Sequence, residues 1–448
     1  MESLKIEKAE DLGAMLRAFR VEPLDESNLA EFYYEDTMTN RTGDKWDSPL
    51  EFLFRDCTTP FATNAHLLLG HRGCGKSTEL CKLKQRFEEY GQPAYTIDPM
   101  IETDLFKVNH WDIMLLITDG LCRIAEKKHV TIDETLLQNV FDYIKKDQEE
   151  ITTVDKSASI NMSGGVEAKT PSLIKLVLSA FASLTSEIKV STARQITIKE
   201  KMEKRAADWV MYTKEISDRI AAACNNKQPI IIFDNLDKIP NPKKIFDLLR
   251  FSVLAQMPFP IIYTFPISQF YASEFASIAG LYKPHVLPMI KVSNLDKSEN
   301  REGIDVMREI VGLRANLRLF DETNKVLETM IKQTGGCLRH LFECIITAAE
   351  RAGRRGADKI EEEDAKRAFS GLKGELNRQI SQPDYPKLTN IYKDPKYREQ
   401  ISDRDFLLEK MQSTVVLEYQ NGDRWHDLHP LVADFLLKQG EIGDSSDR

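Results

Sequence analysis

The chain has 448 residues, of which 42% are hydrophobic and 29% charged, and this balance is typical of a soluble globular protein with two to four domains. Its formal net charge of −9 is unlike that of a protein that binds nucleic acid or acidic membranes over its whole surface. The seven cysteines are scattered without a C-x-x-C pair, which argues against a disulfide framework and against a zinc site.

The N-terminal segment, residues 1–60, is expected to be helical. Its first residues, MESLKIEKAEDLG, carry acids and lack a long apolar stretch, so they do not predict a signal peptide. Amphipathic patterns predict one helix from Asp11 to Phe19 and another from about Pro49 to Asp56. We expect a cytoplasmic protein that makes no membrane contact, since its longest central apolar run is about half the length of a membrane span.

A phosphate-binding loop is predicted at residues 70–77. The apolar run AHLLLG (65–70) indicates a buried strand, and it leads into GHRGCGKS, which has the spacing G-x-x-x-x-G-K-S. A helical pattern follows up to Gly91, and PAYTIDP (93–99) predicts a second strand. Strand, glycine loop, helix and strand begin an open parallel sheet. We therefore predict an α/β P-loop NTPase core over residues 61–295.

The residue types of this loop suit the binding of ATP and Mg²⁺. Glycines allow successive backbone N–H groups to approach oxyanions closely. Lys76 is expected to contact the β and γ phosphates, and Ser77 to ligate Mg²⁺. Arg72 either steers a phosphate or a neighbouring subunit or is simply solvated. The residues expected to bind the nucleotide are Gly70, Arg72, Gly73, Cys74, Gly75, Lys76, Ser77 and Thr78.

The rest of the core is expected to continue the sheet around a helical insertion. Helices are predicted over 111–126, 133–146, 171–184 and 191–224, and residues 151–225 are interpreted as the insertion. Strands are predicted within 228–239, over 259–266 and over 286–292, with helices over 242–256 and 268–281 between them. Apolar runs without alternation favour strands that are covered on both faces.

Polar residues follow two of these strands and supply catalytic candidates. Asp234 ends the run IIIF and is expected to hold Mg²⁺, whereas the next residue, Asn235, cannot accept a proton. Asp237 is therefore the candidate for the base or the water-positioning group; a helix N-cap or a salt bridge with Lys238 or Arg250 is the alternative. Thr264 is a candidate to face the γ-phosphate, with a satisfied strand-end hydroxyl as the alternative.

Residues 296–380 are expected to form an all-α lid, because the periodicity is helical from Asn300 onwards. Gly335 and Gly336 interrupt the pattern just before a helix that carries Arg339 in its first turn. A guanidinium at this place can reach the phosphates of a bound nucleotide. The alternative is an ion pair between Arg339 and an acid of the sheet domain.

A winged-helix domain is predicted over residues 381–448 from the order helix, helix, hairpin (VVLEYQNGDRWHDL), helix. His426 and His429 lack further ligands at metal-binding spacing, so core packing and capping of the last helix are favoured. Residues 379–448 hold nine Lys and Arg against thirteen Asp and Glu, so protein contacts are favoured over nucleic acid, which is not excluded.

The order of these motifs resembles AAA+/STAND-type P-loop ATPases related to the origin-recognition branch. GHRGCGKSTEL, IIIFDNLDK, YTFP, GGCLRHL and the tail are most similar to a bacterial group of ATP-binding proteins, over about residues 32–437. The resemblance implies that Lys76 and Ser77 bind ATP and Mg²⁺ and that Asp234 is the Walker B acid. It places Thr264 at the sensor-1 position and Arg339 at the sensor-2 position.

Two departures from the family pattern favour a slow switch over a ring motor. Asn235 replaces the usual second acid, and residues 268–286, where such subunits commonly present an arginine finger, contain no arginine. The favoured hypothesis is an ATP-binding, slowly hydrolysing switch that regulates a separate effector protein, as proteins of this appearance do in bacterial anti-phage defence. It is compatible with homo-oligomerisation. The alternatives are a DNA-loading ATPase of replication or transposition type and, less favoured, a small-molecule kinase.

Overall fold

The computed structural model describes residues 6–59, 63–102, 108, 110–132, 206–321, 323, 325–394 and 404–442. The helices predicted over 133–146 and 171–184, and most of the insertion 151–225, lie outside these ranges. No helix within them is both long enough and apolar enough to cross a membrane.

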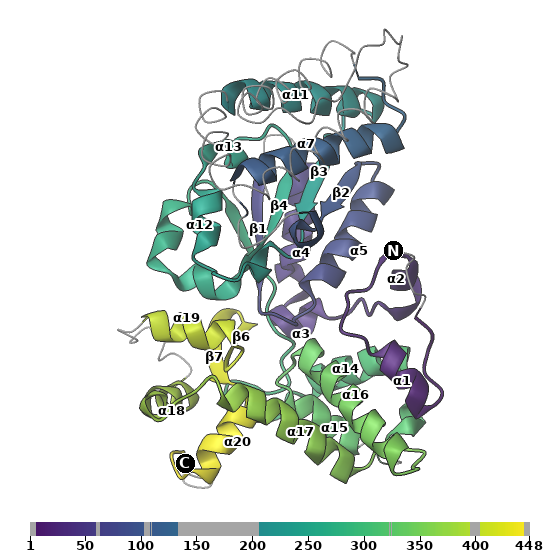
Figure 1. The fold of residues 1–448 in the computed structure, drawn as a ribbon, viewed down its shortest axis with the longest axis vertical. Helices are drawn as coiled ribbons and strands as arrows, with labels where there is room; N and C mark the ends of the chain where they lie inside the picture. Colours follow the sequence, from purple (N-terminus) through teal and green to yellow (C-terminus); the bar gives the residue numbers. More distant parts are fainter. Residues whose placement is uncertain are drawn as a thin grey trace, which may run out of the picture.

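A parallel five-stranded sheet forms the centre of the fold (Figure 1). Its strands are β1 (Ala65–Gly70), β2 (Ala94–Ile97), β3 (Ile230–Phe233), β4 (Ile261–Pro266) and β5 (Lys283–Val286). They lie in the order β2-β3-β4-β1-β5, and each adjacent pair is parallel. The predicted α/β P-loop sheet is confirmed. Because β4 lies between β1 and β3, the carboxyl ends of these three strands meet at one edge.

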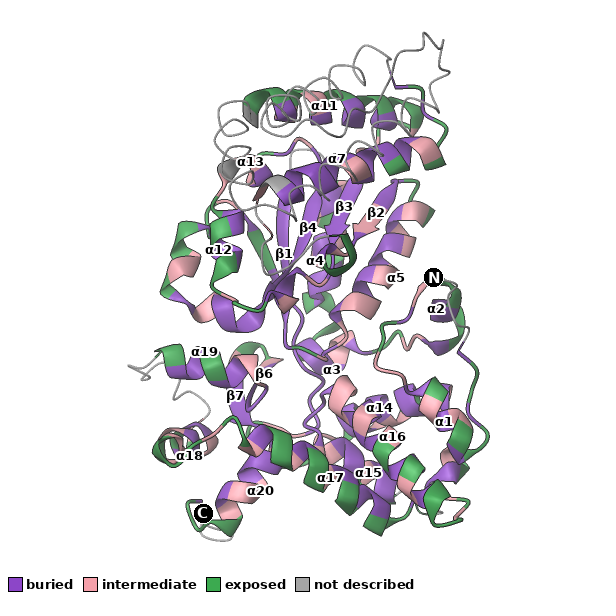
Figure 2. Cartoon of the chain, in the orientation of Figure 1, coloured by how far each residue is buried: buried purple, intermediate pink, exposed green. Residues whose placement is uncertain are grey.

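Helices cover both faces of the sheet, which explains why its strands are apolar without alternation. Leu68, Ile232 and Ile262 pack on one face with α4 (Pro49–Thr58) and α5 (Lys76–Glu89). Their chain neighbours pack on the other face. The helices there are α7 (His110–Lys127), α11 (Ala206–Ala223), α12 (Lys244–Leu249) and α13 (Ser252–Ala255). The central strands β1, β3 and β4 are buried along their whole length, whereas the edge strands β2 and β5 are only partly buried (Figure 2).

Three boundaries differ from the sequence prediction. The last strand is Lys283–Val286 rather than 286–292. The backbone from residue 288 onwards bonds to side chains of the N-terminal segment: Arg41 donates to the Pro288 carbonyl, and Asn40 accepts from the Lys291 N–H. The helix predicted over 242–256 is divided into α12 and α13. The helix predicted over 268–281 is replaced by the short 3₁₀ helices η3 (Ile267–Tyr271) and η4 (Ser273–Ser277), whose aromatic side chains face each other.

The N-terminal helices lie between the sheet and the lid. They are α1 (Leu12–Ala18), α2 (Glu26–Phe32) and α3 (Met38–Thr42), with a 3₁₀ turn, η1, at Lys45–Asp47. Asp11 caps α1 as an Asx side chain should, by accepting from the Ala14 N–H at 2.8 Å. The backbone at Ala9 pairs with the lid at Ala315. This segment therefore contacts the lid directly.

The lid and the C-terminal part are arranged side by side below the sheet in Figure 1. The lid consists of α14 (Arg301–Arg314), α15 (Lys325–Gln333), α16 (Leu338–Arg354) and α17 (Glu362–Asn377). The C-terminal part contains α18 (Tyr385–Lys393), α19 (Arg404–Gln412), β6 (Val416–Asn421), β7 (Asp423–Leu428) and α20 (Pro430–Lys438). Strands β6 and β7 form the predicted antiparallel hairpin.

Candidate nucleotide site

The loop between β1 and α5 has the backbone conformation that its glycines predict. Gly73 and Gly75 have φ angles of +81° and +104°, which residues with a Cβ rarely adopt. Gly75 is the N-cap of α5, so the free N–H groups of this 14-residue helix face the loop. This end of the helix is suited to bind an anion such as a phosphate.

The lid lies directly against this loop. A Cβ at Gly73 would be 2.6 Å from Cβ of Arg339 and 2.9 Å from Sγ of Cys337, so only glycine permits the approach. The Arg339 N–H also donates to the Gly73 carbonyl at 3.3 Å. The structure thus places Arg339, on the first turn of α16, beside the loop as the sequence predicts.

Lys76 is buried in an ion pair with Asp237. Its Nζ lies 2.9 Å from Oδ2 of Asp237 and donates to the carbonyls of Gly70 and His71 at 2.9 and 3.0 Å. Burial alone would lower the pKa of Lys76, but the Asp237 carboxylate raises it. Burial alone would raise the pKa of Asp237, but the Lys76 ammonium lowers it. Both groups are therefore held in their charged forms.

Asp234 and Ser77 provide two oxygen donors at one place. The Ser77 hydroxyl is close enough to the Asp234 carboxylate to affect its pKa, and Oδ1 of Asp234 accepts from the Asn235 N–H at 2.8 Å. Burial raises the pKa of Asp234, although the Ser77 hydroxyl opposes this. A hydroxyl and a carboxylate are hard oxygen ligands of the kind that Mg²⁺ prefers, so the pair fits the predicted magnesium site.

Asn235 and Thr264 stabilise the turn that follows β3. Asn235 has φ +64°, a conformation that asparagine tolerates better than most residues, and its Nδ2 donates to Oδ2 of Asp98 at 2.7 Å. Thr264 is fully buried, and its hydroxyl accepts from the N–H groups of Leu236 and Asp237 at 2.9 and 3.4 Å. The structure therefore shows Thr264 supporting the segment that carries Asp237 instead of lining the pocket.

A pocket of about 250 Å³ opens beside the loop between the N-terminal segment and the lid. The polar residues that line it include Arg72, Lys76, Ser77, Thr78, Asp237 and Arg339. The apolar residues that line it include Val21, Pro23, Leu24, Phe32, Ile310, Leu338 and Phe342. A cavity that combines phosphate-binding groups with apolar side chains suits a nucleotide. Gly70, Cys74, Asp234 and Thr264 do not line this pocket; Asp234 is reached through Ser77.

The N-terminal contribution to this pocket was missed by the sequence prediction. The Leu24 N–H donates to Oγ1 of Thr78 at 3.2 Å, which joins this segment to the start of α5. The buried Arg41 donates from Nη2 to the Cys74 carbonyl at 2.8 Å. An arginine in a helical segment of mixed composition gives no local signal that distinguishes it from a solvated one.

The C-terminal hairpin also contacts the loop, through His71. Nε2 of this buried histidine accepts from the Glu418 N–H at 2.8 Å, and burial lowers the pKa of His71 to about 4. The Glu418 carboxylate accepts from the Tyr271 hydroxyl and lies 3.3 Å from Nε2 of His426. His426 is thus buried at an interface, and His429 caps α20 by accepting from the Leu431 N–H, as predicted.

No family model matches the sequence, and no curated protein matches it. Among solved structures the chain is similar to Cdc6p from Pyrobaculum aerophilum, with 12% identity, a TM-score of 0.35 and coverage of 87% of this chain and 93% of that one. The ORC1 protein of Aeropyrum pernix in complex with DNA has 14% identity and a TM-score of 0.35, with coverage of 88% of this chain and 92% of that one. The RuvB Holliday junction branch migration motor of Thermotoga maritima has 9% identity and a TM-score of 0.35, with coverage of 88% of this chain and 93% of that one. At these identities and scores the similarity carries no functional argument.

Proposed function

We propose that the protein is a Mg²⁺-dependent ATP-binding switch of the AAA+ kind that hydrolyses ATP slowly. One observation carries the proposal: the phosphate loop contacts the lid through Gly73 and Arg339 and the C-terminal hairpin through His71 and Glu418. A ligand that rearranges this loop, residues 71–75, therefore acts on the lid and on the C-terminal hairpin at once. A nucleotide switch requires contacts of this kind between its binding loop and the parts that move.

The Lys76–Asp237 ion pair is the element that the nucleotide would rearrange. Incoming β and γ phosphates compete with the Asp237 carboxylate for the Lys76 ammonium, since both are anions. Once released, Asp237 is free to orient the attacking water or to accept its proton. Bound through Ser77 and Asp234, Mg²⁺ would neutralise charge on the phosphates. Arg339 approaches the same phosphates from the lid.

Slow hydrolysis follows from the environment of Asn235. Its amide cannot accept a proton, and Nδ2 of this amide already donates to Oδ2 of Asp98 at 2.7 Å. Asp237 is the remaining base candidate, and in this conformation Lys76 neutralises it. A turnover far below that of a motor protein is the expected consequence.

The proposal is tested by Lys76→Ala, with Lys82→Ala as a matched control on the same helix, where Lys82 pairs with Glu35 at the surface. Equilibrium binding of Mg·ATP and its hydrolysis are measured for both variants. We expect Lys76→Ala to lose binding and turnover together, and Lys82→Ala to keep both. Normal binding by Lys76→Ala would refute the assignment of the site.

The partner that the switch controls is proposed to be a separate effector protein. The sequence shows no nuclease-like acid cluster with a paired lysine and no nucleophile–base pair at recognisable spacing. An effector activity such as cleavage would then have to come from another protein or from another copy of this chain. No contact within the described residues distinguishes a role in anti-phage defence from other settings, so the proposal is limited to nucleotide-gated control.

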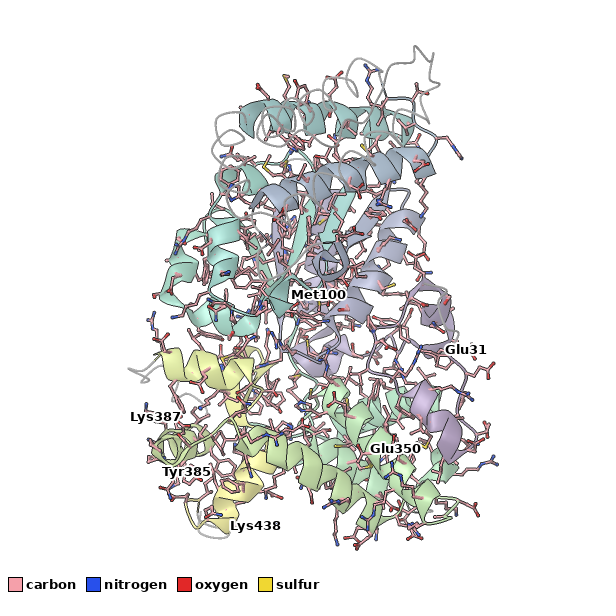
Figure 3. All side chains as sticks on the ribbon, viewed as in Figure 1. Glu31, Met100, Glu350, Tyr385, Lys387 and Lys438 are labelled. Atoms are coloured by element: carbon pink, nitrogen blue, oxygen red, sulfur yellow. The ribbon has the colours of Figure 1, made fainter. Side chains whose placement is uncertain are left out.

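A DNA-loading ATPase is the second candidate, favoured by the order helix, helix, hairpin, helix in the C-terminal part. Lys387 and Lys438 lie at the outer edge of this part, where a nucleic acid could reach them (Figure 3). Its excess of acids weighs against the candidate, because duplex binding depends on neutralising phosphates. The candidate predicts turnover that duplex DNA stimulates with steep salt dependence; unchanged turnover with duplex and single strands would remove it.

A further inference from the structure

A cluster of two histidines and an aspartate lies apart from the nucleotide site, between α4 and the sheet. His66 is the second residue of β1, His285 belongs to β5 and Asp56 to α4. One ligand atom from each of the three lies within 4.8 Å of those of the others. Both imidazoles are buried, His66 completely and His285 with 5% exposed.

The fold explains why these side chains meet. β1 pairs with β5 so that Leu68 is opposite His285, and residues two apart on a strand share a face. His66 therefore projects on the same face as Leu68, which packs against α4 and α5. The last residue of β1, Gly70, is four positions further along the strand, about 13 Å away. The cluster is thus near the opposite end of the strand that leads into the phosphate loop.

The distances match the edges of a metal coordination polyhedron. Nε2 of His285 lies 3.3 Å from Nδ1 of His66 and 3.6 Å from Oδ2 of Asp56. Two ligands at the usual zinc distances of about 2.0–2.1 Å, arranged tetrahedrally, are about 3.3–3.4 Å apart. An ion between the three atoms therefore needs only small side-chain movements.

The chemistry of the three groups also suits a transition metal. A neutral imidazole has a lone pair to donate to a metal ion, and both rings are buried beside a carboxylate. The backbone of Pro49 also acts on the His285 ring, at the place of an outer contact that orients a ligating imidazole. Imidazole nitrogens with a carboxylate favour Zn²⁺ over Mg²⁺ or Ca²⁺.

One cation already approaches the cluster. Nζ of Lys283 lies 2.7 Å from Oδ2 of Asp56, without the geometry of a hydrogen bond, and its side chain is 48% exposed. A half-exposed lysine can move into solvent at little cost. Its ammonium would then compete with a metal ion for the carboxylate without blocking the site.

We propose that Asp56, His66 and His285 form a binding site for Zn²⁺ or a similar divalent transition metal, with water as a fourth ligand, which ties α4 to β1 and β5. This site is independent of the proposed nucleotide site, so neither proposal depends on the other. Its role is structural: it would fix the face of the sheet on which α5 also packs.

The test uses the full chain without an affinity tag, stripped with a chelator and then equilibrated with Zn²⁺ alone. Metal content is measured after removal of the free ion. We expect one equivalent in the wild type and in His129→Ala, a control histidine that is exposed. We expect at least a tenfold loss of affinity in His285→Ala and in Asp56→Asn. Equal zinc content in all four proteins would overturn the proposal.

Two further measurements keep the test decisive if His285→Ala fails to fold. Lys283→Ala leaves the three ligands intact and removes the competing ammonium, so it should bind Zn²⁺ several-fold more tightly; unchanged or weaker binding would contradict the site. With Co²⁺, the wild type should show the visible absorption of a four-coordinate ion without thiolate charge-transfer bands. Such bands would assign the metal to cysteines, of which Cys57 is the nearest in sequence, and would overturn the proposal.

Discussion

At the scale of single residues, the site is built on a buried charge pair. Lys76 and Asp237 are each about nine-tenths buried or more, and each stabilises the charge of the other. A buried ion pair contributes little net stability, because desolvation offsets its attraction. We infer that its value is functional, since a phosphate can take the place of one partner.

Asp237→Asn tests this pair. The asparagine cannot accept a proton, so turnover should fall by about tenfold or more. Affinity for Mg·ATP should stay the same or become tighter, because Lys76 loses its competing carboxylate. Steady-state turnover and equilibrium binding separate the two effects, and Asp247→Asn, at an exposed position of α12, is the control. Unchanged turnover would remove Asp237 from the catalytic residues.

Arg41→Met tests the residue that sequence reasoning missed. The arginine donates to the Pro288 and Cys74 carbonyls while fully buried, and methionine fills similar space without donors. Loss of these charged hydrogen bonds should lower the free energy of unfolding by about 2–3 kcal/mol and weaken nucleotide binding. Denaturant unfolding measures the change, with the exposed Arg17→Met as control. Equal stability of the two variants would contradict this role.

At the scale of elements, Gly335 and Gly336, which precede α16, determine where the lid contacts the segment after β5 and the C-terminal hairpin. Gly336 has φ +76°, and a Cβ there would overlap the carbonyl oxygen of Ile290. Gly335 has φ +59°, and its carbonyl accepts from the Tyr419 hydroxyl of the hairpin at 2.8 Å. The sequence predicts a break at this pair, but not that three parts of the chain converge on it.

Gly336→Ala should therefore be strongly destabilising, because it adds backbone strain to a steric overlap. We expect the free energy of unfolding to fall by about 2 kcal/mol or more. Gly371→Ala is the control: this glycine lies inside α17 with nothing within 4 Å of a Cβ, so alanine should stabilise by up to about 1 kcal/mol. A thermal unfolding comparison that shows equal Tm values would contradict the account.

Elements whose signals are local were predicted from the sequence, whereas those set by distant contacts were not. The β1–loop–α5 unit and the β6–β7 hairpin follow from glycine spacing and turn residues. The end of β5 could not be predicted in this way, because Asn40 and Arg41, which are more than 240 residues away in the sequence, bind the backbone that follows it. Several apolar residues that line the pocket, such as Leu24 and Phe32, come from the same N-terminal segment and belong to no motif.

At the scale of the whole molecule, His71 joins the phosphate loop to the C-terminal hairpin. The charged or titratable groups that act on it are Glu418, His426 and Lys76, and the net effect is a pKa lowered to about 4, chiefly by burial. The folded protein therefore resists protonation of His71, whereas the unfolded chain takes up the proton near pH 6.5. Stability should be lost as the pH falls from about 6.5 towards 4.

His71→Gln should reduce this pH dependence, since glutamine can accept from the Glu418 N–H without titrating. The free energy of unfolding is measured between pH 8 and pH 4.5 for both proteins. We expect the wild type to lose more stability on acidification than the variant. Parallel curves would show that His71 does not contribute to the dependence.

The central claim is that the phosphate loop passes nucleotide binding on to the lid and the hairpin. Hydrogen exchange of residues 335–343 and 416–428 tests it most directly, with and without Mg²⁺ and a non-hydrolysable ATP analogue. We predict that the analogue changes exchange in both segments of the wild type and in neither segment of Lys76→Ala. Bound analogue that leaves both segments of the wild type unchanged would contradict the switch.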